Sequence, residues 1–269
     1  MYFYRYTKAM KQDQHYIPKF ILKRFADQKT KSFKVFDMKL GRYLTGPKYP
    51  RKTMMKKFFY EHDSFMPNEI EDLLSSRETI YSPIIDKLIN DQHITKVEFA
   101  LLLEFRHITY YRSSEFIAFH TYQKQRGDNS WMQRADWRMI NGISNTEDDA
   151  KKSQLNAIRR TISGTEPILE LSLMTPVCFV LKSAGKSFVI GDNGSLSMGG
   201  EFDGVVVIVV SPAAALMFPR TLKALELMKQ YSLKLCDCLL VFQDIKDDLV
   251  DLINDRTKEQ AFAYWVETI

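Results

Sequence analysis

The sequence contains little cysteine, glycine or proline and no long hydrophobic run. Three cysteines are an odd number in a chain of 269 residues, which is typical of reduced thiols rather than of a disulfide framework. The longest apolar stretch, residues 205–218, is interrupted by Ser211 and Pro212 and is shorter than the roughly 18 residues that a membrane-spanning helix needs. Residues 1–14 lack the apolar run of a signal peptide. We therefore expect a soluble, cytoplasmic protein without a membrane partner.

Two common catalytic motifs are also missing. No Gly-Lys-Ser/Thr sequence follows the glycines near residues 191–200, so these glycines do not form a phosphate-binding loop of the nucleotide-hydrolase type. No Gly-x-Ser-x-Gly sequence occurs, which excludes the usual nucleophile turn of α/β-hydrolases. The few glycines and prolines, 11 and 9, also argue against long flexible linkers.

Positive charge is concentrated at the start of the chain. Residues 1–60 contain 16 lysines and arginines but only three acidic residues, a net charge of +13, whereas residues 61–269 contain 22 basic and 30 acidic residues, a net charge of −8. The same segment is rich in aromatic residues. Basic side chains bind phosphates and aromatic rings stack on unpaired bases, so the segment could bind nucleic acid. Alternatively, the cations face water while the rings fill a core.

The pattern of the chain predicts an α+β fold that is mostly helical, with a small mixed or antiparallel sheet and a long buried central helix. We expect a tail over residues 1–14 and a single domain over residues 15–269. The domain would have a basic α/β opening (15–66), a helical middle (67–175), and strands followed by helices (176–269).

Local signals place the first elements. Apolar spacing after Pro18 predicts a helix over residues 18–26, and alternation predicts a hairpin that turns near residues 38–41. Residues 58–60, Phe-Phe-Tyr, are expected to form a short strand. The sheet would combine this hairpin with strands at 176–183, 187–190 and 205–210.

The helical middle is expected to contain several helices. The first begins near Pro67 and is broken or kinked at Pro83. The second begins after Thr95 with a Thr95–Glu98 capping box and runs to about Gln125, apolar on nearly every side. Further helices are expected at residues 131–142, 146–163, 165–174 and 220–231, with two more at the end of the chain.

Several motifs occur in an order that resembles the DUF4238 family of uncharacterised proteins. The opening His15-Tyr16-Ile17-Pro18 is the most specific; a pair of glutamates on one helix (71–78), Arg112, and the segment ending in Asp192-Asn193 follow. Two positions depart from the family pattern: Gly194 replaces the usual proline after Asp-Asn, and Ser-Ser replaces Thr-Pro after Arg112. The resemblance implies no activity, since the family has no established biochemistry.

Five residues are candidates for chemistry, and each has a structural alternative. His15 could act as a base, ligand or phosphate contact, or it could bind a backbone carbonyl. Glu71 and Glu78 could bind a divalent metal ion with Asp192 or act as general acid and base; alternatively they form salt bridges at a helix edge. Arg112 could clamp a phosphate.

The alternative for Arg112 is a buried ion pair with Glu104 or Glu115, because its helix is too apolar to be a surface element. Asp192 could belong to a site at the end of a strand, or Asp192, Asn193 and Gly194 could simply form a turn.

Two hypotheses for function follow from these residues. The first is a protein that acts on RNA or single-stranded DNA, in the manner of a nuclease-like effector, with His15, Glu71, Glu78, Arg112 and Asp192 in one site. The nucleic acid would then contact basic residues of the opening, namely Lys19, Lys23, Arg24, Arg51 and Lys52. The second is a non-enzymatic binding or regulatory module, in which the polar residues form a buried structural network.

Overall fold

The computed structural model confirms an α+β fold. It describes residues 10–113, 116, 147–164, 178–198, 204–219, 240–261 and 263–269. These residues form five α-helices, one 3-10 helix and three sheets, so a mostly helical chain is not confirmed. The helices predicted at 131–142, 165–174 and 220–231 lie outside the described residues.

The chain opens with a small two-stranded sheet and a short helix. Strand β1 (Asp13–His15) pairs antiparallel with β4 (Met55–Lys57). Helix α1 (Lys19–Phe25) follows Pro18 as predicted, and a 3-10 turn, η1 (Pro50–Lys52), contacts it. Residues 58–60 form a turn rather than the predicted strand, because Phe58 adopts a left-handed φ of 53° that ends β4.

Three longer helices form one side of the molecule: α2 (Glu69–Ile89), α3 (Lys96–Tyr111) and α6 (Glu147–Ser163). Helix α2 continues through Pro83 instead of breaking there, because Tyr81, Ile84 and Leu88 on both sides of it pack into the core. The predicted capping box is present: the Thr95 hydroxyl accepts from the Glu98 N–H, and the Glu98 carboxylate accepts from the Thr95 N–H.

Helix α3 is shorter than the sequence suggested, and a long buried central helix is not confirmed. It ends at Tyr111, whereas the sequence predicts an end near Gln125. The Ser113 hydroxyl donates to the Tyr110 carbonyl and accepts from the Phe116 N–H, so its side chain competes with the helical bonds there. Val97 and Tyr110 are exposed on this helix, while Phe105 and Ile108 are buried.

The larger sheet is mixed and has the order β10-β5-β9-β8-β7. Its strands are β5 (Cys178–Lys182), β7 (Leu196–Met198), β8 (Val205–Ser211), β9 (Ala214–Pro219) and β10 (Leu240–Asp244). The long apolar run of the sequence is therefore a hairpin, in which β8 and β9 pair antiparallel on either side of Pro212. Among the described strands, β10 and β5 are the one parallel pair.

The predicted N-terminal hairpin is present, as β2 (Lys34–Asp37) and β3 (Arg42–Tyr43), but it belongs to a separate sheet. That antiparallel sheet has the order β3-β2-β11-β6, where β6 is Ile190–Gly191 and β11 is Tyr264–Glu267. Two expectations are thereby corrected. The strands do not form one sheet, and the chain ends in a strand, because residues 264–267 fill the gap between β2 and β6.

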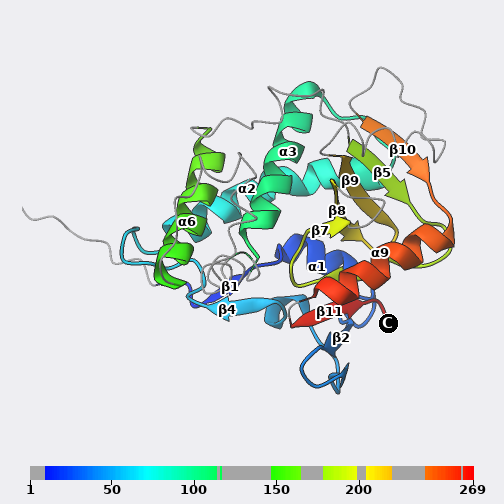
Figure 1. Ribbon diagram of the computed structural model, residues 1–269, viewed down its shortest axis with the longest axis horizontal. Coiled ribbons are helices and arrows are strands. Elements are labelled where there is room, and N and C mark those ends of the chain that lie inside the picture. Colours follow the sequence, from blue (N-terminus) through cyan, green and yellow to red (C-terminus); the bar gives the residue numbers. More distant parts are fainter. Residues whose placement is uncertain are drawn as a thin grey trace, which may run out of the picture.

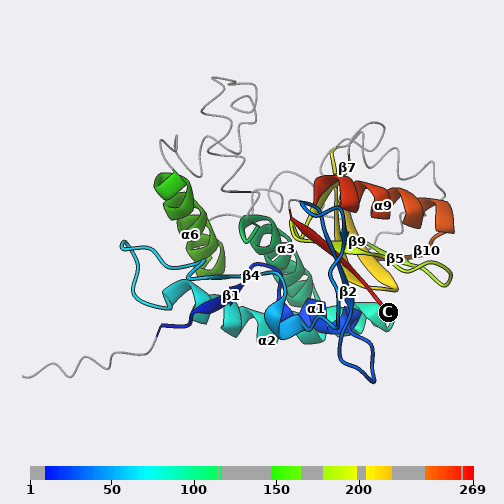
Figure 2. The same ribbon diagram turned by 90° about the horizontal axis from the view of Figure 1, so that it is seen from below.

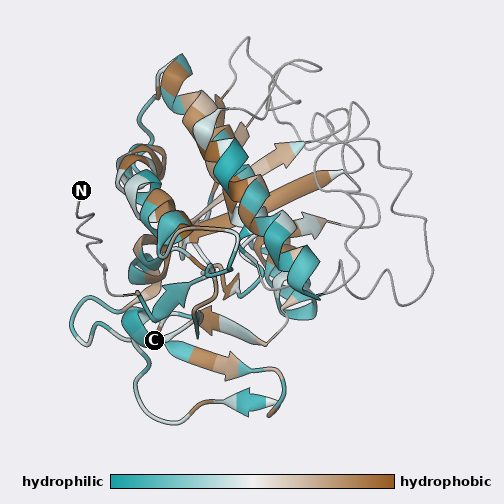
Figure 3. Ribbon diagram, turned by 90° about the vertical axis from the view of Figure 1, so that its left-hand side faces the viewer, coloured by the Kyte–Doolittle hydropathy of each residue, from teal (hydrophilic) through white to brown (hydrophobic). Residues whose placement is uncertain are grey.

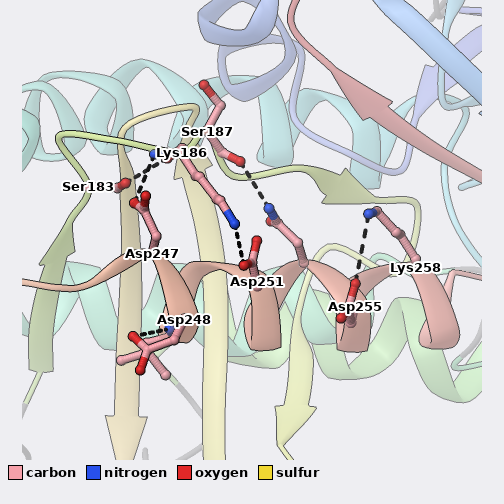
Figure 4. Close-up of polar contacts among 10 residues, drawn as sticks. Ser183, Lys186, Ser187, Asp247, Asp248, Asp251, Asp255 and Lys258 are labelled. Atoms are coloured by element: carbon pink, nitrogen blue, oxygen red, sulfur yellow. Dashed lines mark hydrogen bonds and ion pairs between the residues drawn. The ribbon is translucent and has the colours of Figure 1, made fainter.

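Helix α9 (Asp247–Gln260) covers β6 and β7 and fixes the segment that leads into β6. Asn254 accepts from the Val189 N–H and donates to the Ser187 carbonyl, both at 2.9 Å. Lys186 forms an ion pair with Asp251, and its backbone N–H donates to Asp247 (Figure 4). The turn that carries Asp192 is thus held from one side by α9.

The helices and the larger sheet share one hydrophobic core. Helices α3 and α6 lie on one side and the larger sheet with α9 on the other, while α2 runs from α6 to the sheet and α1 lies close to β8 (Figures 1 and 2). The buried cluster includes residues from α1, α2, α3, β5 and β8. The strands of the larger sheet are mainly hydrophobic, whereas β3 at the outer edge of the smaller sheet is hydrophilic (Figure 3). No helix among the described residues is both long enough and apolar enough to cross a membrane.

Candidate functional site

The buried guanidinium of Arg112, at the C-terminal end of α3, joins three segments. It donates to Glu78 Oε1 at 2.6 Å, to the Tyr60 hydroxyl at 3.2 Å and to the His15 carbonyl oxygen at 2.6 Å. Its side chain is only 3% exposed. A buried cation needs such partners, since an uncompensated charge in the core is strongly destabilising. Arg112 therefore fixes the position of β1 against α2.

Tyr60 and Gln14 complete the frame around Arg112. The Tyr60 hydroxyl accepts from Arg112 and donates to the His15 carbonyl at 3.1 Å, and burial raises the pKa of this hydroxyl. The Gln14 side chain accepts from the Tyr60 N–H at 2.5 Å and donates to Glu61 at 2.7 Å. The turn after β4 is thereby tied to β1 by side chains as well as by the β1–β4 ladder.

The His15 imidazole is held in one tautomer. Its Nε2 lies 2.9 Å from the Pro50 carbonyl oxygen, which can only accept, so Nε2 carries the proton of the neutral ring. Burial lowers the pKa of His15 below its ordinary 6.5, and the nearby cations Lys19 and Arg112 act in the same direction. Nε2 of His15 therefore binds a backbone carbonyl, which is the structural alternative that the sequence allows, while Nδ1 keeps its lone pair.

Glu71 lies close enough to Arg112 for the charge of Arg112 to act on it, but unlike Glu78 it forms no ion pair with Arg112. Glu78 is paired with Arg112, whereas the Glu71 carboxylate forms no hydrogen bond with any residue that the structure describes. Burial raises the pKa of Glu71 to about 7, and Glu78 adds to the rise, while Arg112 and Lys11 oppose it. At neutral pH this half-buried carboxyl can therefore either donate or accept a proton.

Arg112 pairs with Glu78 and not with Glu104, one of the two partners that its own helix suggested. Glu104 lies 3.0 Å from Arg77 Nε and accepts from the Tyr81 hydroxyl at 2.5 Å, in a second buried network between α2 and α3. Burial raises the pKa of Glu104. The other candidate, Glu115, lies outside the described residues.

Asp192 is buried in a different environment. Its Oδ2 accepts from the Ala263 N–H at 2.8 Å, and its own N–H donates to the Tyr264 carbonyl at 3.0 Å, so it ties the turn after β6 to β11. Its charge acts on Tyr16, the neighbour of His15. The residues at 192–194 thus form a structural turn, which is the alternative that the sequence left open.

A metal site formed by Glu71, Glu78 and Asp192 does not fit these contacts. Glu78 is neutralised by Arg112, and Asp192 accepts from the backbone N–H of Ala263, just before the last strand. Among the described residues, no group of three or more histidine, cysteine or acidic side chains is arranged to hold a metal ion. The chemistry that the arrangement allows is proton transfer by His15 and Glu71.

Four of the five predicted nucleic-acid contacts are exposed. Lys19 and Lys23 lie one turn apart on α1, and Arg51 and Lys52 lie on η1. Arg24 is the exception, because its side chain, 14% exposed, pairs with Asp86 at 2.7 Å and donates to the Phe20 carbonyl. Lys56 and Lys57 of β4 are also exposed. We call Lys19, Lys23, Arg51, Lys52, Lys56 and Lys57 the basic strip.

Sequence reasoning found four members of the cluster but missed its frame. We call His15, Tyr60, Glu71, Glu78 and Arg112 the Arg112 cluster; Asp192 is the predicted site residue that lies outside it. Tyr60 was recognised only as part of an aromatic segment, and Gln14 was assigned to a tail. The signal for Tyr60 was its place at the end of Phe58-Phe59-Tyr60, where an aromatic residue follows a strongly basic stretch.

Comparison with known proteins identifies a family. No curated protein and no solved structure matches this chain. The model of the family described as "protein of unknown function (DUF4238)" matches residues 13–267. These limits run from the first residue of β1 to the last of β11. The Arg112 cluster, the basic strip and all three sheets lie within these limits. The chain therefore belongs to the DUF4238 family.

Proposed function

We propose that this protein binds RNA or single-stranded DNA along the basic strip and acts on it as a nuclease-like protein. The strip comes from adjoining elements, because α1 contacts η1, and η1 leads within three residues into β4. Phosphate groups would be bound by its six cations, which release counterions when they are neutralised. The only acidic residue in β1 and β4 is Asp13, opposite Lys57.

Exposed aromatic rings flank the strip. Tyr49, just before η1, is 43% exposed, and Phe58, just after β4, is 37% exposed. Such rings offer stacking surfaces for unpaired bases, whereas bases in a duplex would not reach them. These two positions favour a single-stranded ligand.

One observation carries the proposal: the strip and the titratable cluster share a contact. The His15 imidazole donates to the carbonyl of Pro50, the first residue of η1, and Arg51 and Lys52 follow directly. A strand bound to the strip would therefore pass beside His15. Cys178 is a buried free thiol, and free thiols are typical of a reducing compartment. This fits an intracellular, cytoplasmic role.

The test is a binding measurement by fluorescence anisotropy with labelled 16-nucleotide RNA and DNA single strands at low salt. We expect Arg51→Glu/Lys52→Glu to weaken binding by at least tenfold. The matched control, Lys96→Glu/Lys246→Glu, changes two exposed lysines on α3 and before α9, away from the strip. Absence of binding by the parent, or equal loss in both variants, would contradict the proposal.

A second function is favoured by one specific observation. Arg112, Tyr60 and Glu78 satisfy one another, as expected for a buried network in a non-enzymatic binding module. On that interpretation the protein would bind the same strands without cleaving them. Incubation of bound oligonucleotides, followed by electrophoresis, separates the two functions.

A further inference from the structure

The tight turn between β2 and β3 presents apolar side chains to solvent. We call residues 38–43, Met-Lys-Leu-Gly-Arg-Tyr, the hairpin tip, and all six are exposed. Met38, Leu40 and Tyr43 are 36%, 54% and 42% exposed. The hairpin forms the lower end of the molecule in Figures 1 and 3, so the tip is open to a large partner.

The backbone of the tip is held in one shape. Asp37 Oδ1 accepts from the Leu40 N–H and the Asp37 carbonyl accepts from the Gly41 N–H, both at 2.9 Å. Gly41 has a φ of +62°, which favours glycine, and a Cβ atom added to it would meet no atom within 4 Å. The Met38 N–H donates to the Ala263 carbonyl. Because the turn is already ordered, binding through it would cost little conformational entropy.

The charge of the tip is positive. Lys39 and Arg42 alternate with the apolar residues, and neither forms an ion pair with any residue that the structure describes. The nearest acidic residue in the sequence, Asp37, is buried, and its carboxylate is used within the turn. The tip therefore combines apolar side chains with two available cations.

Aromatic rings support the tip from the sheet. The ring centroids of Tyr43 and Phe36 are 5.3 Å apart, and Phe36 stacks on Trp265 of β11 at 5.0 Å. The Tyr43 hydroxyl donates to Glu267 at 2.9 Å. An exposed aromatic ring with a polar end is typical of the boundary between lipid and water. The apolar turn thus stands on a stiff base whose outermost ring suits such a boundary.

We propose that the hairpin tip binds the surface of an anionic lipid bilayer. Met38 and Leu40 enter the region between headgroups and acyl chains, where their apolar surface leaves water. Lys39 and Arg42 lie beside the lipid phosphates and carboxylates, and each cation near an anionic membrane surface strengthens binding. Tyr43 lies at the level of the headgroups.

A bilayer fits the tip better than two other partners. A nucleic-acid backbone would satisfy Lys39 and Arg42 but offers no apolar environment to Met38 and Leu40. A second copy that met this tip about a twofold axis would bring the same cations of both copies together, which is unfavourable. An anionic bilayer is complementary to both the charge and the apolar surface.

This surface shares no residue with the basic strip, so the inference is independent of the proposed binding of nucleic acid. The expectation that the protein has no membrane partner rests on the lack of a spanning segment. A peripheral contact through a turn needs none.

The experiment measures flotation of the protein with vesicles of phosphatidylcholine alone and of phosphatidylcholine with phosphatidylserine in a ratio of about 7:3. We expect binding to the anionic vesicles that weakens with added salt, and much weaker binding to the neutral ones. Met38→Ser/Leu40→Ser should weaken binding about tenfold or more. The matched control, Met66→Ser/Val97→Ser, removes two more strongly exposed apolar side chains elsewhere and should bind like the parent.

Charge is tested by a second pair of variants. Lys39→Gln/Arg42→Gln should also weaken binding about tenfold or more, whereas Lys96→Gln/Lys246→Gln, which removes two exposed lysines elsewhere, should have a smaller effect. Leu40→Trp should strengthen binding several-fold, because tryptophan prefers the membrane interface. This gain cannot result from a damaged fold, and thermal unfolding checks the other variants.

Absence of binding to anionic vesicles, or equal losses in the tip variants and their controls, would overturn the inference. Loss of RNA binding in the tip variants without any vesicle binding would assign the tip to nucleic acid instead. A dimer that Met38→Ser/Leu40→Ser dissociates, again without vesicle binding, would assign it to a second copy. Vesicle binding by a parent that binds no RNA would support the inference and contradict only the proposed function.

Discussion

A single side chain, Arg112, links parts of the chain that are far apart in sequence. Its three partners, Glu78, Tyr60 and His15, are 34, 52 and 97 residues away. Because each of its three guanidinium nitrogens donates to one of these partners and the side chain is buried, Arg112 has little capacity left for a phosphate. Its contribution to a site is thus to hold His15 and Glu78 in place, which makes it a positioning residue rather than a catalytic one.

Loss of Arg112 should therefore be costly. We predict that Arg112→Met lowers the free energy of unfolding by about 3 kcal/mol or more, because Glu78 and the His15 carbonyl lose their partner inside the fold. Arg112→Lys should cost less, because it restores the charge but not all three hydrogen bonds. Urea unfolding measures both, and a Met variant within about 0.5 kcal/mol of the parent would contradict this role.

Glu71, unlike Arg112, is predicted to make the fold less stable when it is charged. Burial raises its pKa from 4.5 to about 7, so between these values the folded state binds more protons than the unfolded state. Stability from this group is therefore present below pH 4.5 and is lost as pH rises to about 7. The Glu71→Gln variant has no carboxyl to titrate at this position. The melting temperature of the variant should therefore fall less than that of the parent between pH 5 and pH 8.

Glu78→Gln is the control at this site. It removes the charge that pairs with Arg112 at 2.6 Å, so it should lower the melting temperature at pH 8, where Glu71→Gln should not. Equal pH profiles for the parent and Glu71→Gln would show that Glu71 titrates as an ordinary exposed carboxylate.

At the scale of elements, short-range signals predicted helices well. The Thr95–Glu98 capping box, the helix after Pro18 and the helix ending at Gly164 are determined by neighbouring residues, and all three are present. Pro83 shows the limit of such rules, because tertiary packing on both sides outweighs the lost hydrogen bond of one proline.

Strand pairing was harder to predict because it depends on distant partners. Strand β11 lies between β2 and β6, more than 200 residues from the first and about 70 from the second, and no local pattern specifies that position. The same holds for the site. His15, Glu78 and Arg112 were recognisable as residues, but the pairing of Arg112 with Glu78 required the relative placement of α2 and α3.

The turn after β6 explains one departure from the family pattern. Gly194 has a φ of +72°, which proline cannot adopt, so a proline would not fit this turn. A Cβ atom at Gly194 would also lie 3.0 Å from side-chain atoms of Ile17 and Thr109. The turn therefore packs directly against the segment that follows His15.

Gly194→Ala should consequently destabilise the fold. Left-handed backbone costs a non-glycine residue about 1–2 kcal/mol, and the close contacts with Ile17 and Thr109 add to this. Gly46→Ala is a matched control, since Gly46 has a φ of +70° but no atom within 4 Å of an added Cβ. Denaturant unfolding should show a larger loss for Gly194→Ala, and equal losses would indicate that the turn can move away from Ile17.

At the scale of the whole molecule, charge is segregated by sequence and by surface. The first 60 residues carry a net charge of +13 and supply the basic strip, whereas the acidic excess lies in later elements. Helix α9 contributes Asp247, Asp248, Asp251 and Asp255, some of which pair with lysines (Figure 4). A polyanion would therefore be attracted to the strip and repelled from the acidic face of α9.

This segregation predicts a defined dependence of binding on salt. If all six cations of the basic strip contact phosphates, the logarithm of the association constant for single-stranded RNA should fall with the logarithm of salt concentration with a slope of about −4. Arg51→Gln/Lys52→Gln removes two of the cations, so its slope should be about −3. Lys96→Gln/Lys246→Gln removes two exposed charges elsewhere and should keep the parent slope. The same change in both variants would show that net charge rather than the strip determines binding. A slope near zero for the parent would show that binding does not depend on phosphate contacts.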